Sequence, residues 1–283
     1  MVIRAPRLAL LVLVLAAVGG AAVMPAAADV PASPRETAPP VVPDGGARSA
    51  NRIALALGAL HMALRDDIIG PLKWDGPGAA MDFAYWRRSP VSCQGVELDL
   101  PLGLLTNRYG HRAGALGLRA GYAYLRRTAW SGGRASTFLG GSFGRNSDLQ
   151  LYLDWDEEHL YWITTYDLAG VIQHEVRLAK GHGFEITLAV PMVSLVSRPP
   201  RSRYYKVDDF KNPGFYLSKP QENMSVAVFG ELLSLDASLS YAFALKGSWA
   251  FWAKYGFQYR RYPEPETIRM SSSTFSLRVT HDF

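Results

Sequence analysis

The last ten residues alternate between apolar or ring-bearing side chains and polar ones. One parity holds Phe275, Leu277, Val279, His281 and Phe283, and the positions between them are all polar. Successive side chains of a β-strand point to opposite faces of a sheet. The period of two therefore predicts a strand with one apolar face and one polar face.

The same alternation recurs along most of the chain after residue 50. Hydrophobic residues share one parity in the segments 96–104, 116–124, 149–155, 184–196, 235–245 and 249–259. Weaker alternation marks 52–64, 79–88, 134–145 and 164–179, and the first of these also fits a short helix. Together the segments predict about ten antiparallel strands. Because single-chain bacterial barrels have even strand numbers, the range is about eight to twelve.

Strands of this kind fit a transmembrane barrel, in which one face meets lipid and the other meets the lumen. The polar faces are rich in Gly, Ser and charged residues, among them Glu97, Asp99, Arg119, Lys254 and Arg260. Charges in a narrow lumen need partners, so we expect salt bridges that plug it. The sequence thus predicts an all-β, up-and-down antiparallel barrel over residues 51–283.

Two of the predicted strands carry more specific expectations. In one, a single lipid-facing row should hold Phe184, Ile186, Leu188, Val190, Met192 and Val196. In the other, Pro101 has no N–H to donate to a strand ladder, so we expect a β-bulge or an edge position there.

The start of the chain has the three parts of an export signal. Arg4 and Arg7 precede an apolar core, and small residues follow at 26–28. This predicts a signal peptide over residues 1–28, cleaved near Ala28. Residues 29–50 contain five prolines and almost no large apolar residue, which predicts a disordered periplasmic tether. A single Cys excludes an internal disulfide framework.

An even strand number places both chain ends in the periplasm. Extracellular loops then fall near 65–78, 107–111, 157–163, 198–233 and 262–267. The longest is 198–233, and we expect its second half, Val226 to Leu233, to form a short helix over the barrel mouth. Long loops outside and short turns inside are the asymmetry that such barrels show.

The opening of this long loop is basic and aromatic. It carries Arg198, Arg201, Arg203, Tyr204, Tyr205 and Lys206. Arg binds phosphate in a bidentate fork, so one hypothesis is recognition of lipid phosphates, including those of lipopolysaccharide. The other is a solvated loop whose cations pair loosely with Asp208 and Asp209. The sequence leaves both open.

Carboxylates gather at the end of another predicted strand. Asp154, Asp156 and Glu157 stand together, followed by Glu158 and His159. Oxygen ligands of this kind bind Ca²⁺, and paired carboxylates serve as acid and base in hydrolysis. No EF-hand ligand ladder is present, so a solvated acidic rim is the simpler interpretation. The sequence indicates no cofactor.

His174 shares its parity with Ile172 and Val176 and should face outward. Barrel-embedded lipases use an outward His beside a Ser, which makes His174 the one catalytic candidate. No Ser stands at a matching spacing, and CxxC, HExxH and GxSxG motifs are absent. The formal net charge of +5 is too small and too dispersed to predict nucleic-acid binding.

The signal peptide, the alternating strands and the C-terminal Phe283 together resemble Gram-negative outer-membrane β-barrel proteins as a class. His281 stands where an aromatic residue is common, two residues before the terminal Phe. The resemblance implies handling by periplasmic chaperones, insertion by the barrel-assembly machinery, which recognises the terminal row Phe275 to Phe283, and a location in the outer membrane. It implies no particular activity.

Three classes of function follow. The first is a non-enzymatic envelope barrel with a structural or ligand-binding role in its extracellular loops. The second is a narrow passive pore, which needs a continuous water path through the lumen. The third is a barrel enzyme acting on lipid or peptide, which needs a His beside a nucleophile or a pair of carboxylates.

Overall fold

The computed structural model describes residues 50–132, 134–152, 154, 159–178, 181–200, 219–245 and 247–283. The predicted signal peptide and residues 29–49 of the predicted tether lie outside these ranges. Within the described ranges, no helix is long and apolar enough to cross a membrane.

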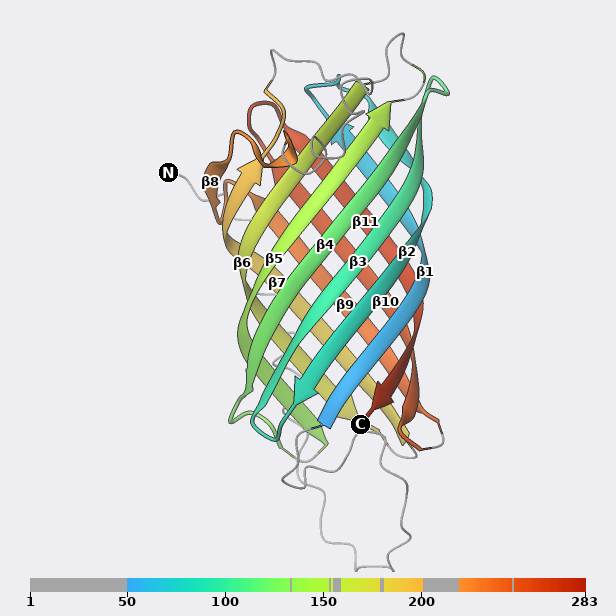
Figure 1. Ribbon diagram of the computed structural model, residues 1–283, viewed down its shortest axis with the longest axis vertical. Helices are drawn as coiled ribbons and strands as arrows, with labels where there is room; N and C mark the ends of the chain where they lie inside the picture. Colours follow the sequence, from blue (N-terminus) through green and yellow to red (C-terminus); the bar gives the residue numbers. More distant parts are fainter. Residues whose placement is uncertain are drawn as a thin grey trace, which may run out of the picture. The chain divides into compact units, whose positions relative to one another are not determined.

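The described chain folds into one antiparallel sheet that closes on itself (Figure 1). The strands are β1 (Ala50–Asp66), β2 (Lys73–Arg88), β3 (Ser92–Asn107), β4 (Arg112–Arg127), β5 (Ala135–Tyr152), β6 (His159–Arg177), β7 (His182–Ser197), β8 (Ser225–Val228), β9 (Leu233–Ala244), β10 (Trp249–Tyr262) and β11 (Ile268–Asp282). Ten of them form the barrel, and β8 pairs only with β7. The predicted number is confirmed, and all four weaker segments are strands.

The barrel closes where β1 pairs with β11, next to the two ends of the described chain. The N–H of Asn51 donates to the carbonyl of Phe283 over 3.0 Å, and the N–H of Phe283 donates back to the carbonyl of Asn51 over 2.9 Å. Both ends therefore lie at one rim, here called the terminal rim. The opposite end, the loop rim, carries the connections 67–72, 108–111, 153–158, 198–232 and 263–267. These match the five predicted loops within a few residues, except that β2 already begins at Lys73 and β6 at His159.

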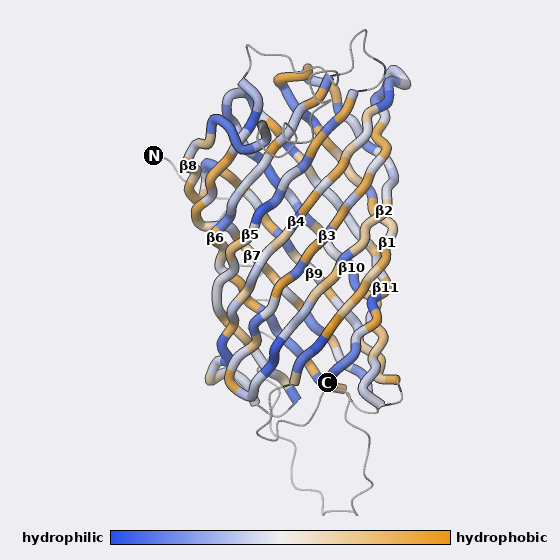
Figure 2. Tube along the Cα trace, in the orientation of Figure 1, coloured by the Kyte–Doolittle hydropathy of each residue, from blue (hydrophilic) through white to orange (hydrophobic). Residues whose placement is uncertain are grey.

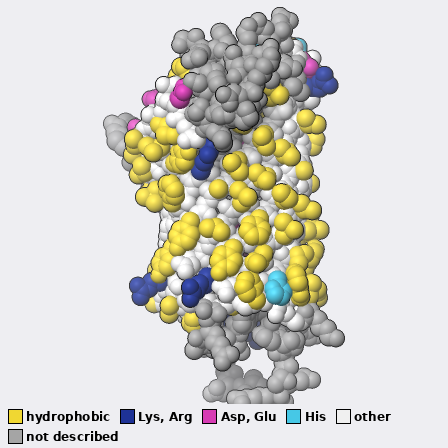
Figure 3. Space-filling view, in the orientation of Figure 1, with side chains coloured by type: hydrophobic (Ala, Val, Ile, Leu, Met, Phe, Trp, Pro, Cys, Tyr) yellow, Lys and Arg dark blue, Asp and Glu magenta, His cyan; other side chains and the backbone are white. Residues whose placement is uncertain are grey.

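Hydrophobic side chains cover the outside of the barrel, as the alternation predicts. Each strand changes between apolar and polar residues along its length (Figure 2), and apolar side chains spread over the middle of the wall (Figure 3). Phe275 is 55% exposed and belongs to the outward terminal row. Near the terminal rim, the His281 ring lies 4.5 Å from that of Trp249 and 6.1 Å from that of Phe283. Exposed rings at a barrel end suit a lipid–water interface.

The prediction for Val196 is wrong, and a β-bulge explains why. Val190 pairs with Gly170, but Val193 pairs with Leu168, so β7 holds one extra residue at Met192. Beyond the bulge the parity reverses, because one inserted residue moves every later side chain to the other face. Met192 points outward as predicted, whereas Val196 is only 1% exposed and lies inside the barrel.

Pro101 produces neither of the predicted irregularities. It lies inside β3, which has a neighbour on each side, and the β3–β4 register is the same before and after it. The ladder to β4 is simply interrupted opposite Pro101, where Gly117 stands. A Cβ on Gly117 would lie 2.4 Å from the Pro101 Cγ, so a glycine makes room for the proline ring.

The expected helix over Val226 to Leu233 does not form either. Residues 225–228 are β8, which extends the sheet along the loop end of β7. The only helical turn in the described part of this connection is a 3-10 turn, η4 (Lys219–Gln221). Alternating Ser225, Val226 and Val228 favour a strand once the edge of β7 is available for pairing.

Candidate functional site: the barrel lumen

The inward side chains near the loop rim form an apolar cluster, which we call the lumen plug. Its larger members are Leu60, Met62, Leu64, Trp74, Leu105, Tyr152, Tyr161, Ile163, Val196, Tyr262 and Ile268. The rings of Trp74 and Tyr152 pack edge to face with centroids 4.9 Å apart, and those of Tyr152 and Tyr161 lie 5.9 Å apart. The sequence prediction of a polar lumen fails in this part of the barrel.

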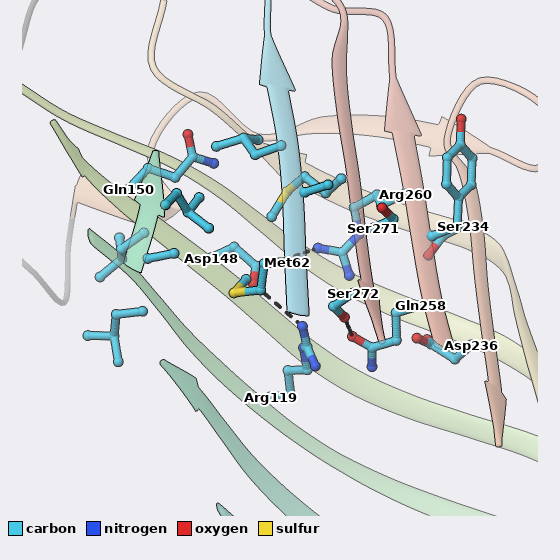
Figure 4. Close-up of a pocket in the computed structure, with 18 residues that line it drawn as sticks. Met62, Arg119, Asp148, Gln150, Ser234, Asp236, Gln258, Arg260, Ser271 and Ser272 are labelled. Atoms are coloured by element: carbon cyan, nitrogen blue, oxygen red, sulfur yellow. Dashed lines mark hydrogen bonds and ion pairs between the residues drawn. The ribbon is translucent and has the colours of Figure 1, made fainter. Parts of the chain in front are cut away.

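Below the plug lies an ion layer of paired charges. The Arg260 guanidinium donates to Asp148 Oδ2 over 2.9 Å, and Arg119 lies 3.8 Å from the other oxygen of Asp148. Arg119 also donates to Asp99 Oδ2 over 2.9 Å. Figure 4 shows Arg119 and Arg260 converging on Asp148 next to Met62 of the plug. The cavity in this layer measures about 30 Å³. Three of the charges predicted to pair in the lumen therefore do so.

Further toward the terminal rim the lumen widens into a polar cavity of about 280 Å³. A second cavity of about 160 Å³ continues it and shares the lining residues Trp86, Glu97, Lys254 and Arg278. We call the two together the chamber. Arg278 donates to Asp82 over 3.0 Å. Within the described residues, neither Glu97 nor Lys254 has a hydrogen bond or ion pair, so the predicted inward charges are only partly paired.

At the terminal rim, charged pairs line the lumen. Arg52 donates to both oxygens of Asp282, over 2.6 and 2.9 Å, and stacks over the Trp252 ring. Arg88 pairs with Glu175. The lumen is thus mainly apolar at the loop rim, apart from the buried Asp66–Arg198 ion pair, and ionic at the terminal rim.

Arg198 is not an exposed phosphate ligand, contrary to one of the two hypotheses for the long loop. Its side chain is 2% exposed and donates to both oxygens of Asp66, each over 2.7 Å. It also donates to the backbone carbonyls of Glu264 and Glu266. Both terminal nitrogens of the Arg198 guanidinium therefore already donate to acceptors within the protein. The other candidates in this loop, Arg201, Arg203, Tyr204, Tyr205 and Lys206, lie outside the described residues.

Asp154 lies at the loop rim and binds an arginine. Its carboxylate accepts hydrogen bonds from the backbone N–H of Arg112, over 2.6 Å, and from the guanidinium of the same residue, over 3.1 Å. These hydrogen bonds lower the pKa of the Asp154 carboxyl from its ordinary value. Asp156 and Glu157 lie outside the described ranges. Elsewhere in the described chain, no three metal-ligating side chains are close enough to hold an ion.

His174 faces outward on β6, as its parity predicts. Its Nδ1 lies 2.9 Å from the Thr137 hydroxyl on β5. Thr137 is only 5% exposed. The neighbour of the His174 ring is therefore a threonine that is largely buried, and the serine that a lipase-like site needs does not take this position.

The sequence matches no protein-family model and no curated protein. In structure, the chain is similar to the outer-membrane protease OmpT of Escherichia coli, with a TM-score of 0.52, 7% identity and coverage of 83% of this chain and 96% of that one. It is also similar to the translocator domain of the autotransporter NalP from Neisseria meningitidis, with a TM-score of 0.47, 9% identity and coverage of 86% and 91%. The likeness to OmpT shows the fold alone, that of a Gram-negative outer-membrane β-barrel. The predicted resemblance to this class is confirmed.

Proposed function

We propose that this chain is a non-enzymatic β-barrel of the bacterial outer membrane that does not conduct solutes. The observation that supports this most directly is the lumen plug. Its apolar side chains are buried inside the barrel near the loop rim. The ion layer borders it, since Met62 and Leu64 line the same small cavity as Arg119 and Asp148. The apolar outer wall, which exposes residues such as Phe275 and Leu57, favours insertion into lipid.

A hydrated ion meets two obstacles along this axis. The ion layer leaves a cavity of about 30 Å³, which holds about two water molecules at roughly 10–15 Å³ each. The plug then offers side chains such as Trp74, Leu64 and Ile163, which cannot replace the hydration of a charge. Moving an unpaired charge into such surroundings is strongly unfavourable. A passive pore, the second class of function, lacks support at this level of the barrel.

Because the lumen is not proposed to conduct, we place the function of the barrel in the connections at its loop rim. The connection from β7 to β9 is tied to the barrel by Arg198, by a hydrogen bond from the Ser197 hydroxyl to the carbonyl of Glu222, and by one of 2.8 Å between the hydroxyls of Ser225 and Tyr262. The two described ends of this connection are thus held against the barrel. We assign a structural or ligand-binding role to the loop rim and propose lipopolysaccharide as its partner.

The biogenesis expected for this class is part of the same proposal. The signal peptide would be removed near Ala28, and the outward row that ends in Phe283 would be the segment that the barrel-assembly machinery recognises. The exposed sides of Phe275, Leu277 and Val279 support this, because a recognition element on a strand needs an accessible face.

Liposome swelling tests the proposal. The mature chain is refolded into liposomes, and folding is checked by the heat-dependent shift of its gel mobility. We expect swelling in a small sugar such as arabinose no faster than in protein-free liposomes. A variant with Trp74→Ala and Tyr152→Ala removes the two packed rings of the plug and should swell faster. Wild-type swelling as fast as that of the variant would refute the closed barrel.

A further inference from the structure

The chamber holds more negative charge than its own cations neutralise. Five carboxylates line its larger cavity against three cations: Asp82, Glu97, Asp99, Asp167 and Asp236 face Arg119, Lys254 and Arg278. Asp82 and Asp99 are paired with arginines. Against the other three carboxylates the cavity itself adds Lys254, while Arg119 and Arg260, whose charges also act on Asp236, are shared with Asp148 of the ion layer.

Asp167 of β6 carries a buried, unpartnered acceptor in the wall of this cavity. The residue is only 5% exposed, and its Oδ2 accepts hydrogen bonds from the Asn146 amide over 2.6 Å and from the Thr165 hydroxyl over 2.7 Å. Its Oδ1 is buried and has no hydrogen-bond partner in the described structure. Buried carboxylate oxygens almost always accept a hydrogen bond. A hydrogen-bond donor from outside the described residues is therefore expected at this atom.

Two further carboxylates extend this acceptor surface. Asp236 on β9 and Glu97 on β3 also line the cavity, and neither forms a hydrogen bond or ion pair with another described residue. Asp167, Asp236 and Glu97 therefore bring three carboxylates from three strands to the lining of one cavity. Trp86 adds an aromatic side chain to the lining, and aromatic faces attract ammonium groups.

We propose that the chamber binds a small organic cation with two ammonium groups, a linear diamine. Each ammonium group donates up to three hydrogen bonds and carries the charge that the lining lacks. The two continuous cavities, about 280 and 160 Å³, suit an elongated molecule better than a single metal ion. The absence of a three-ligand metal group among the described residues agrees with this choice.

The ligand enters from the terminal rim. There the lumen is lined by the ion pairs Arg52–Asp282 and Arg88–Glu175, which can exchange partners with a cation, whereas the plug at the loop rim is mainly apolar. Binding in the chamber requires no passage through the plug. The inference therefore goes beyond the proposed function and does not depend on it.

Isothermal titration calorimetry of the refolded barrel with 1,5-diaminopentane tests the inference, at pH 7 and low salt after full equilibration. We expect one saturable site per barrel, weakened by added salt. Asp167→Asn and Asp236→Asn should each weaken binding at least about tenfold, since a hydrogen bond to a charged group contributes roughly that much or more. Lys254→Met should tighten binding, because it removes a competing cation.

The matched control is Asp75→Asn, which makes the same chemical change on the outside of the barrel and should leave binding unchanged. If Asp167→Asn fails the gel-shift test for folding, Asp236→Asn probes the same cavity from β9. A folded wild-type barrel that binds no diamine would overturn the inference. So would equal affinity in the Asp236→Asn variant, weaker binding in Lys254→Met, or a chamber that takes Ca²⁺ but not the diamine.

Discussion

At the scale of single residues, burial decides what an arginine does in this protein. Arg198 and Arg112 each bind one aspartate through two hydrogen bonds from the guanidinium. The Arg198 side chain is 2% exposed, whereas that of Arg112 is 70% exposed. A buried partner cannot be replaced by water, and an exposed one can. The first pair therefore fixes the fold, and the second adds little to it.

Arg198→Ala should lower the free energy of unfolding by about 3–5 kcal/mol, because it leaves the Asp66 carboxylate buried without its counter-charge. Urea titration of the refolded barrel measures this. The control is Arg112→Ala, which removes an exposed pair and should cost much less than Arg198→Ala. The double variant Arg198→Met with Asp66→Leu should recover much of the loss. Equal effects of the two single variants would refute the distinction.

The Asp154 carboxyl should titrate below its ordinary range in the folded barrel, because Arg112 hydrogen-bonds to its charged form. A pKa that is lower in the folded state than in the unfolded state stabilises the fold above the unfolded pKa. This contribution disappears as the pH falls through the folded pKa. A ¹³C NMR titration of the Asp154 carboxyl measures the midpoint. Arg112→Ala should raise it, and an unchanged midpoint would contradict the assignment.

At the scale of strands, a period of two predicts the structure well wherever the two faces meet different surroundings. In β11, Phe275 meets lipid while Ser276 meets the lumen, and the alternation is clear. In the loop half of β1, Leu60, Met62 and Leu64 belong to the plug, so the inward face is apolar there. The alternation of apolar and polar residues is therefore weak in this strand, which is why the segment 52–64 also fitted a helix. The apolar residues Leu60, Met62 and Leu64 on the inner face of β1 were the feature of the sequence from which the plug could have been predicted.

Other features lie beyond local pattern. The extra residue at Met192 reverses the parity of Val196, and only pairing with β6 reveals it. The inward position of Arg119 and Arg260 follows from parity, but their shared partner Asp148 lies on β5, next to the strand of Arg119 and 112 residues before Arg260. Asp66 meets Arg198 in the same way. Sequence thus predicts which charges face the lumen, whereas the closure of the barrel decides which of them pair.

Gly117→Ala should destabilise the barrel by about 1–3 kcal/mol, the usual cost of overpacking. The new methyl group would lie 2.4 Å from the rigid Pro101 ring. Gly256→Ala, on the inner face of β10, is the matched control, since no atom lies within 4 Å of its new Cβ. It should be neutral or slightly stabilising. The heat-shift temperature on gels compares the two. A Gly117 variant as stable as the Gly256 variant would show that β3 and β4 adjust to the proline differently.

At the scale of the whole barrel, the lumen changes in character from one rim to the other. It runs from the apolar plug through the ion layer and the chamber to the ion pairs at the terminal rim. Charges that are paired across the lumen neutralise one another, and apolar side chains occupy the end near the loop rim. In the closed barrel that we propose, the charges of the ion layer fill the lumen as pairs, whereas the less fully paired charges of the chamber lie on its terminal side.

Single-channel recording of the refolded mature chain in a planar bilayer tests this closure most directly. Folding is confirmed by the heat shift on a gel, and the Trp74→Ala, Tyr152→Ala variant serves as the opened reference. The plug predicts that the wild-type barrel stays electrically silent while the variant shows discrete conducting events. Steady conductance of the folded wild-type barrel would contradict the closed lumen and make the protein a pore.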